Sequence, residues 1–159
     1  MTPGKPIQII LDDLRNAIED HCSFSYYYLD RETGEIIFQS ERHHPNDADD
    51  APELDNQYPG EGTAGRFIPV EPMESRRGHE LMKLFIATLD DGGIQSVLSR
   101  AISKRKPFRN FKDVIYDYPD IREKWHVYYA KEIKNIAEEW LQYNHISYEF
   151  VTLKDVMKL

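Results

Sequence analysis

Apolar side chains recur at the spacing of an amphipathic helix in several stretches of the chain. Residues 6–20 show this spacing first, and Pro6 suits the opening turn of a helix. The same spacing predicts helices over residues 79–90, 94–103 and 120–143. Each of these helices has one apolar face, which must be buried against another element.

The breaks between the helices have their own signals. Gly92-Gly93 is typical of a helix end, so the helices before and after it should form a helical hairpin. Pro107 stops the second of them. Asn110 and Asp113 have the spacing of a capping box, which predicts a short helix through about Tyr116.

A different pattern, rich in Tyr, Ile and Phe, marks the strands. Residues 24–29 and 35–39 flank a turn in which Gly34 can adopt a positive φ, and we expect them to form a β-hairpin. Residues 67–70 should be a short strand at a sheet edge or a strand end, because they contain a proline. Residues 147–153 alternate enough to add a fourth strand.

These elements predict an α+β fold, in which a small antiparallel sheet is covered by four to five helices and the C-terminal half is helical. Alternating strand–helix–strand units are absent, so a doubly wound parallel sheet is not expected. A chain of 159 residues is long enough for one hydrophobic core, and we expect residues 1–159 to be a single domain.

An acidic segment from about 41 to 66 interrupts these patterns with prolines and glycines. Residues 40–65 hold seven acids and one base, which accounts for most of the formal net charge of −8. Asp47 and Asp49 alternate as in a calcium loop, but Ala51 stands where the third ligand would be and no glycine follows. We therefore expect a solvated, mobile acidic loop.

The stretch from Arg100 to Lys112 has the opposite charge, with six bases and no acid. Its candidate binding residues are Arg105, Lys106, Phe108, Arg109 and Lys112. The aromatic residues expected to form a structural core are Phe111, Trp125 and Trp140. Basic side chains beside rings suit phosphates and stacked bases, and they also suit an acidic protein surface.

No motif of a familiar catalytic site occurs in the chain. It has no glycine-rich phosphate loop, no GxSxG, no HExxH and no CxxC, and the six histidines are scattered. The single cysteine, Cys22, excludes an internal disulfide and a multi-cysteine metal site, and we expect it to be a small buried hydrophobe. We expect no cofactor and no metal, and an enzyme is the less favoured class.

Two absences bear on location. No run of about 18 apolar residues occurs, so we expect no membrane-spanning helix. The N-terminal residues lack the charged and apolar regions of a signal peptide. Together with the low cysteine content, these features favour the cytoplasm.

The order of residues resembles a bacterial family designated uncharacterised protein family 0158. The resemblance rests on YYYLDRETGEII, the acidic loop, RFIPVEPMES, LMKLFIATLDD, LSRAISKRKPFRNFKDVIYDYPDIREKW and AEEWLQYNHISYEF. It covers about residues 24 to 150, and PFRNFKDVI is its most specific part. Gly78-His79 departs from the aromatic residue expected before Leu81, so that helix should pack differently. The resemblance implies no activity.

The sequence leaves three classes of function open. The favoured class is a non-catalytic protein-interaction or regulatory module that binds a protein partner or a second copy of itself. The alternative is a protein that binds an anion or a nucleic acid through residues 100–112. The second alternative is an enzyme of unknown class.

Overall fold

The computed structural model describes residues 4–40 and 65–157. Apart from its last two residues, the predicted acidic loop lies outside these ranges, so its mobility stays a prediction. Backbone contacts divide the chain into two compact units, one of residues 1–72 and 137–159 and the other of residues 73–136. The expectation of a single domain also stays a prediction, because two such units can still unfold as one.

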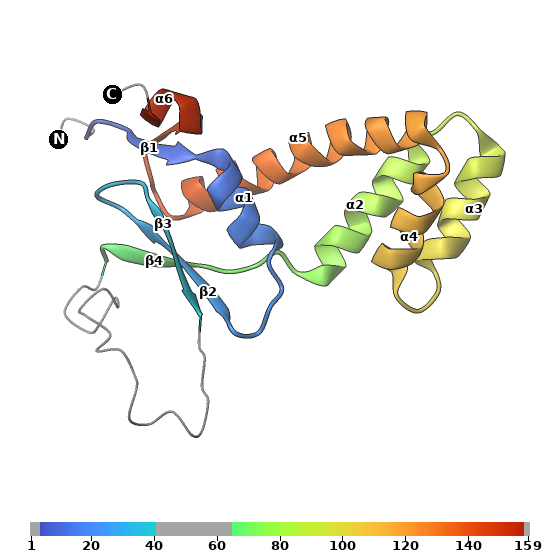
Figure 1. Ribbon diagram of the computed structural model, residues 1–159, viewed down its shortest axis with the longest axis horizontal. Helices are drawn as coiled ribbons and strands as arrows, with labels where there is room; N and C mark the ends of the chain where they lie inside the picture. Colours follow the sequence, from blue (N-terminus) through green and yellow to red (C-terminus); the bar gives the residue numbers. More distant parts are fainter. Residues whose placement is uncertain (1–3, 41–64, 158–159) are drawn as a thin grey trace, which may run out of the picture. The chain divides into compact units, whose positions relative to one another are not determined.

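The described residues confirm the α+β class (Figure 1). The strands are β1 (Ile7–Ile10), β2 (Ser25–Asp30), β3 (Ile36–Ser40), β4 (Phe67–Val70) and β5 (Tyr148–Val151). The helices are α1 (Leu11–Glu19), α2 (Ser75–Ala87), α3 (Gly92–Ile102), α4 (Pro107–Tyr116), α5 (Pro119–Tyr143) and α6 (Leu153–Met157). None of the helices within these described ranges is long and apolar enough to span a membrane.

The first unit contains the predicted β-hairpin. Strands β2 and β3 pair antiparallel, β4 pairs antiparallel with the other edge of β2, and Leu29 of the central strand is fully buried. Gly34 adopts a φ of 82° in the turn, as expected for the bulge position. The turn at Gly34 and the Tyr-, Ile- and Phe-rich strands on either side of it therefore form the predicted hairpin.

A second, parallel sheet was not expected from the sequence. Residues 7–10 form β1 instead of the first turn of a helix, and they pair with β5, with Ile7 opposite Tyr148. The helix begins only at Leu11. The stretch IQII contains three β-branched residues, which pack well in a strand when a partner strand is present. Strand β5, which was expected to join the antiparallel sheet, therefore pairs with β1 instead.

A buried carboxylate anchors the end of β2 to the residue before β4. Asp30 is 4% exposed, and both of its oxygens accept hydrogen bonds from the guanidinium of Arg66, at 3.2 and 3.1 Å. Burial acts to raise the pKa of Asp30, but the Arg66 hydrogen bonds and the Glu32 backbone N–H outweigh it, so the pKa lies below its usual value. The ion pair between Asp30 and Arg66 thus fixes the position at which the chain enters β4.

A second carboxylate organises the turn before β2. Asp20 accepts the backbone N–H of Cys22 and the hydroxyl of Tyr27, at 2.9 and 2.7 Å. Burial and the bond to Asp20 raise the pKa of Tyr27 to about 12. Cys22 is exposed in this turn, so the expectation of a buried thiol was wrong. The backbone N–H of Cys22 stabilises the turn through its bond to Asp20, while its thiol side chain lies in solvent.

In the second unit, α2, α3 and α4 alternate in direction (Figure 1). Helix α3 contacts both α2 and α4, and Asp91 caps α3 by accepting the backbone N–H groups of Gly93 and Ile94. Gly92-Gly93 thus opens α3, whereas α2 already ends at Ala87. Helix α4 begins at Pro107, three residues before the expected capping residue, because proline is favoured in the first turn.

Gly34 should be the residue of the hairpin least able to accept a side chain. A Cβ atom there would collide with the carbonyl oxygen of Gln8, in addition to the strain of its positive φ. We expect Gly34→Ala to lower the free energy of unfolding by more than about 2 kcal/mol. Urea unfolding measures the change.

Gly65 provides the matched control for this substitution. It has a φ of 95°, but no atom lies within 4 Å of the position of an added Cβ. Gly65→Ala should therefore cost only the backbone strain, about 1–2 kcal/mol. Equal losses in the two variants would contradict the close approach between the hairpin turn and β1.

Candidate functional site

The predicted binding residues gather at one end of the second unit, where α3 turns into α4. We call this set the basic end; it comprises Arg105, Lys106, Phe108, Arg109 and Lys112. All five are exposed in the structure. That these five residues act together as one binding surface stays a prediction.

Asn110 holds the turn of the basic end in place. Its side-chain amide donates to the carbonyl oxygens of Ala101 and Arg105, at 3.0 and 2.9 Å. Lys106 has a φ of 58°, a left-handed conformation that non-glycine residues rarely adopt. The predicted capping role of Asn110 for its own helix was wrong, because its amide instead donates to the open carbonyl of Ala101 in the last turn of α3 and to that of Arg105 in the following turn.

The ring of Phe108 packs against Gly78, where the sequence departs from the family pattern. A Cβ atom on Gly78 would lie 2.9 Å from Cε1 of the Phe108 ring, so the ring of Phe108 rests on the backbone of α2. His79 lies beside it, with Nε2 3.0 Å from the carbonyl oxygen of Ile102. The ring is still 41% exposed and is available for contact with a ligand.

No ion pair neutralises the basic end within residues 4–40 and 65–157. Salt bridges in that part of the chain involve Arg15 and Arg66, and neither belongs to the basic end. Arg105, Lys106, Arg109 and Lys112 are all exposed. Four positive charges therefore face solvent within eight consecutive residues, an arrangement that attracts an acidic surface or an anion.

An aromatic cluster joins α2, α4 and α5. The Trp125 ring lies 4.7 Å from Phe111 and 5.2 Å from Phe85, measured between ring centroids. Phe111 is 1% exposed and Trp125 is 9% exposed. Trp140 is half-buried and belongs to the first unit. The cluster thus brings together two of the three aromatic residues named from the sequence and adds Phe85.

A broad groove opens at the other end of the same unit, between the α2–α3 link and the start of α5. Its volume is about 1,070 Å³. The apolar or aromatic lining residues are Phe85, Leu89, Ile94, Tyr118, Pro119, Ile121, Val127 and Tyr128. Five acids and one base line it as well: Asp90, Asp91, Asp117, Asp120, Glu123 and Lys124. We call it the acidic groove.

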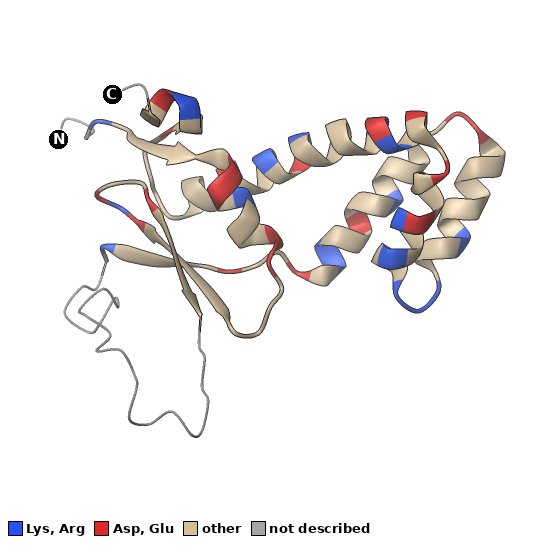
Figure 2. Cartoon of the chain, viewed as in Figure 1, with Lys and Arg blue, Asp and Glu red and all other residues tan. Residues whose placement is uncertain are grey.

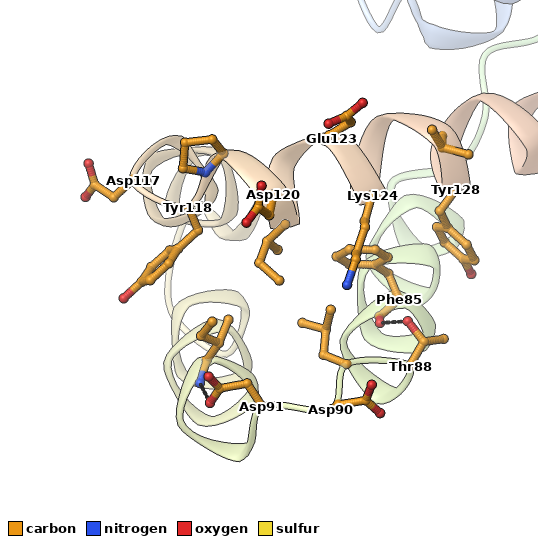
Figure 3. Close-up of a pocket in the computed structure, with 15 residues that line it drawn as sticks. Phe85, Thr88, Asp90, Asp91, Asp117, Tyr118, Asp120, Glu123, Lys124 and Tyr128 are labelled. Atoms are coloured by element: carbon orange, nitrogen blue, oxygen red, sulfur yellow. Dashed lines mark hydrogen bonds between the residues drawn. The ribbon is translucent and has the colours of Figure 1, made fainter.

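The polar side chains that line the acidic groove differ in what they contact. Figure 3 shows the Lys124 side chain extending into the space that the lining residues enclose. Asp91 is already engaged as the cap of α3, and Thr88 donates its hydroxyl to the carbonyl of Phe85 at 2.6 Å. Burial raises the pKa of Tyr128, and the charge of Glu132 raises it further. Tyr128 therefore remains a neutral hydrogen-bonding group at physiological pH.

The two surfaces give the second unit opposite charges at its two ends (Figure 2). Because α2, α3 and α4 alternate in direction, the end of α3 lies near the start of α2 and the start of α4. His79 of α2 contacts the carbonyl of Ile102, and Asn110 of α4 donates to the carbonyl of Ala101. The opposite end joins α2 to α3, where Gln95 donates to the carbonyls of Ile86 and Leu89. Bases therefore predominate at one end and acids at the other.

Sequence reasoning missed the acidic groove. Its acids stand in pairs at helix ends, Asp90-Asp91 before α3 and Asp117 and Asp120 around the start of α5. Acids at those places are ordinary capping and dipole partners, so they give no sign of a shared surface. No group of three His, Cys, Asp or Glu in the described ranges could hold a metal ion.

Comparison with known proteins places the chain in a family. It belongs to the uncharacterised protein family UPF0158, whose pattern matches residues 5–158, and the resemblance noted from the sequence is thereby confirmed. The chain is 28% identical over 146 residues to UPF0158 protein PA5073 of Pseudomonas aeruginosa. That match covers 89% of this chain and 86% of the relative. No solved structure matches the chain.

Single substitutions should separate the buried from the exposed residues of α4. Phe111→Ala removes a fully buried ring from the cluster, and we expect it to lower the free energy of unfolding by about 3–5 kcal/mol. Arg109→Ala, two residues earlier and exposed, should cost no more than about 0.5 kcal/mol. Urea unfolding of both variants measures the difference. A similar loss in the two would mean that Arg109 takes part in packing and is not free to bind.

Proposed function

We propose that this protein is a non-catalytic protein-interaction module whose basic end binds an acidic surface of a partner protein. The observation that supports this best is the set of four exposed bases around the half-exposed ring of Phe108. Aromatic and arginine side chains are enriched where binding energy concentrates in protein interfaces. A location in the cytoplasm remains part of this proposal.

The rigidity of the basic end also favours a binding role. Asn110 fixes the turn by two hydrogen bonds, and Phe108 rests against Gly78. A surface that is ordered before binding loses less conformational entropy when the partner arrives. Electrostatic attraction by four neighbouring bases would speed the encounter and would depend on ionic strength.

Binding of a nucleic acid through residues 100–112 is the second candidate. The six bases of that stretch would contact phosphates, but only one ring is available for stacking, because Phe111 is 1% exposed. A single half-exposed ring supports a stacking platform less well than several rings would. The protein partner is therefore the better supported candidate.

Reversal of the basic charges should separate these candidates. We expect the variant with Lys104→Glu, Arg105→Glu and Lys106→Glu to lose a defined protein that the unaltered chain recovers from nuclease-treated lysate. The purified recovered protein should then bind the unaltered chain directly and bind the variant at least tenfold more weakly. Direct binding by fluorescence anisotropy measures this.

The matched control changes three exposed lysines outside the basic end, with Lys83→Glu, Lys131→Glu and Lys134→Glu. It alters the net charge equally and should still recover the partner. If nuclease treatment abolishes recovery and a labelled single-stranded oligonucleotide binds with a steep salt dependence, the nucleic-acid candidate is correct instead. Recovery that is lost equally in the control would contradict a specific role of the basic end.

A further inference from the structure

We propose that the acidic groove of one molecule receives the basic end of a second copy of this chain, so that the second units associate head to tail. The inference rests on the proposed function, because it names the acidic surface that the basic end binds. It also identifies the occupant of the acidic groove, so that one contact between two copies involves both surfaces.

The charges of the two surfaces are complementary. Five acids and one base line the groove. The stretch from Arg100 to Lys112 carries six bases and no acid. Two grooves would repel each other, and so would two basic ends, because like charges facing each other across an interface are unfavourable. The only attractive combination of these two surfaces joins the groove of one copy to the basic end of the next.

The apolar parts of the two surfaces are complementary too. Ile94, Ile121 and Tyr128 are half-buried in the groove, and Val127 is 69% exposed at its edge. The basic end offers Phe108, whose ring rests on α2 and is 41% exposed. The groove volume of about 1,070 Å³ has room for this ring together with several long basic side chains.

Lys124 indicates the kind of group that the groove accepts. Its side chain extends over the apolar lining, and its ammonium group shares the groove with the acids (Figure 3). An amphipathic cationic side chain suits such a place, since its stem covers apolar surface while its charge stays near acids and water. The arginines of the basic end, Arg105 and Arg109, have the same character and a longer reach.

The spacing of the two surfaces allows one molecule to use both. They lie at opposite ends of α3, whose eleven residues span about 16 Å. A contact between two different surfaces does not close on itself as a twofold dimer does, so it continues into open chains or closes as a ring. Because the contact is small and rich in charge, we expect weak association that is sensitive to salt.

Sedimentation velocity of the full chain tests the proposal directly. At low ionic strength the average mass should rise from the monomer value of 18.7 kDa as the concentration increases. In about 1 M salt, where charges are screened beyond about 3 Å, the chain should sediment as a monomer. A monomer at every concentration in low salt would overturn the proposal, and so would association that survives high salt.

Two charge-reversed variants identify the surfaces. The basic-end variant carries Arg105→Glu and Arg109→Glu, and the groove variant carries Asp90→Lys and Asp120→Lys. Each alone should stay monomeric, because each has lost one half of the contact. Mixed, they should form a 1:1 complex and nothing larger, since the first retains only its groove and the second retains only its basic end. A mixture without complex would contradict the assignment, as would self-association of either variant.

Control variants carry the same charge changes elsewhere. Lys131→Glu with Lys134→Glu matches the basic-end variant. Asp12→Lys with Asp13→Lys matches the groove variant, including the loss of acid from the first turn of a helix. Both controls should associate like the unaltered chain. If the lysines of the groove variant lower its melting temperature, Asp90→Asn with Asp120→Asn provides a milder pair that should also weaken association.

The outcome separates this inference from the proposed function. If the unaltered chain stays monomeric but still binds a recovered acidic protein through its basic end, the inference fails and the proposed function holds. If the chain self-associates as described and binds no other protein, the contact between copies holds and a separate partner is excluded.

Discussion

The packing of aromatic rings around Trp125 is the interaction on which the second unit depends. Its ring meets Phe85 from α2, Phe111 from α4 and Tyr129 from its own helix. Helices of ten to thirteen residues, such as α4 and α2, are marginal by themselves in water. Burial of these rings, with about 0.5–1.5 kcal/mol more for each well-oriented pair, is what holds the three helices together.

The same cluster connects the stability of the unit to its two surfaces. Phe85 and Tyr128 belong to the cluster and also line the acidic groove. Phe111 anchors α4, whose first turn presents Phe108 and Arg109 at the basic end. Movement of the cluster would therefore change the groove and the basic end together. The charges themselves stay in solvent and contribute little to folding, which leaves them available for binding.

Local patterns predicted the elements whose partners are close in sequence. The β-hairpin around Gly34 needed only strands rich in Tyr, Ile and Phe and a turn residue, and the long helix beginning at Pro119 needed only helical spacing. Strand β1 was missed because residues 7–10 fit both a helix and a strand, and the choice depends on β5, far away in the chain. The residues of the basic end are contiguous in the chain and could be named from the sequence, whereas the groove joins acids from separate helix ends that only packing brings together.

Native-state hydrogen exchange of the unaltered chain and of Trp125→Ala tests the central role of the cluster most directly. Because three helices share these rings, the amides of α2, α4 and the first half of α5 should open with one common free energy. The substitution should lower that value by about 3–5 kcal/mol in all three helices at once. Trp125→Phe, which keeps a ring, should lower it less. If α2 and α4 kept their protection in Trp125→Ala, the helices would be held together by other contacts, and the account would be wrong.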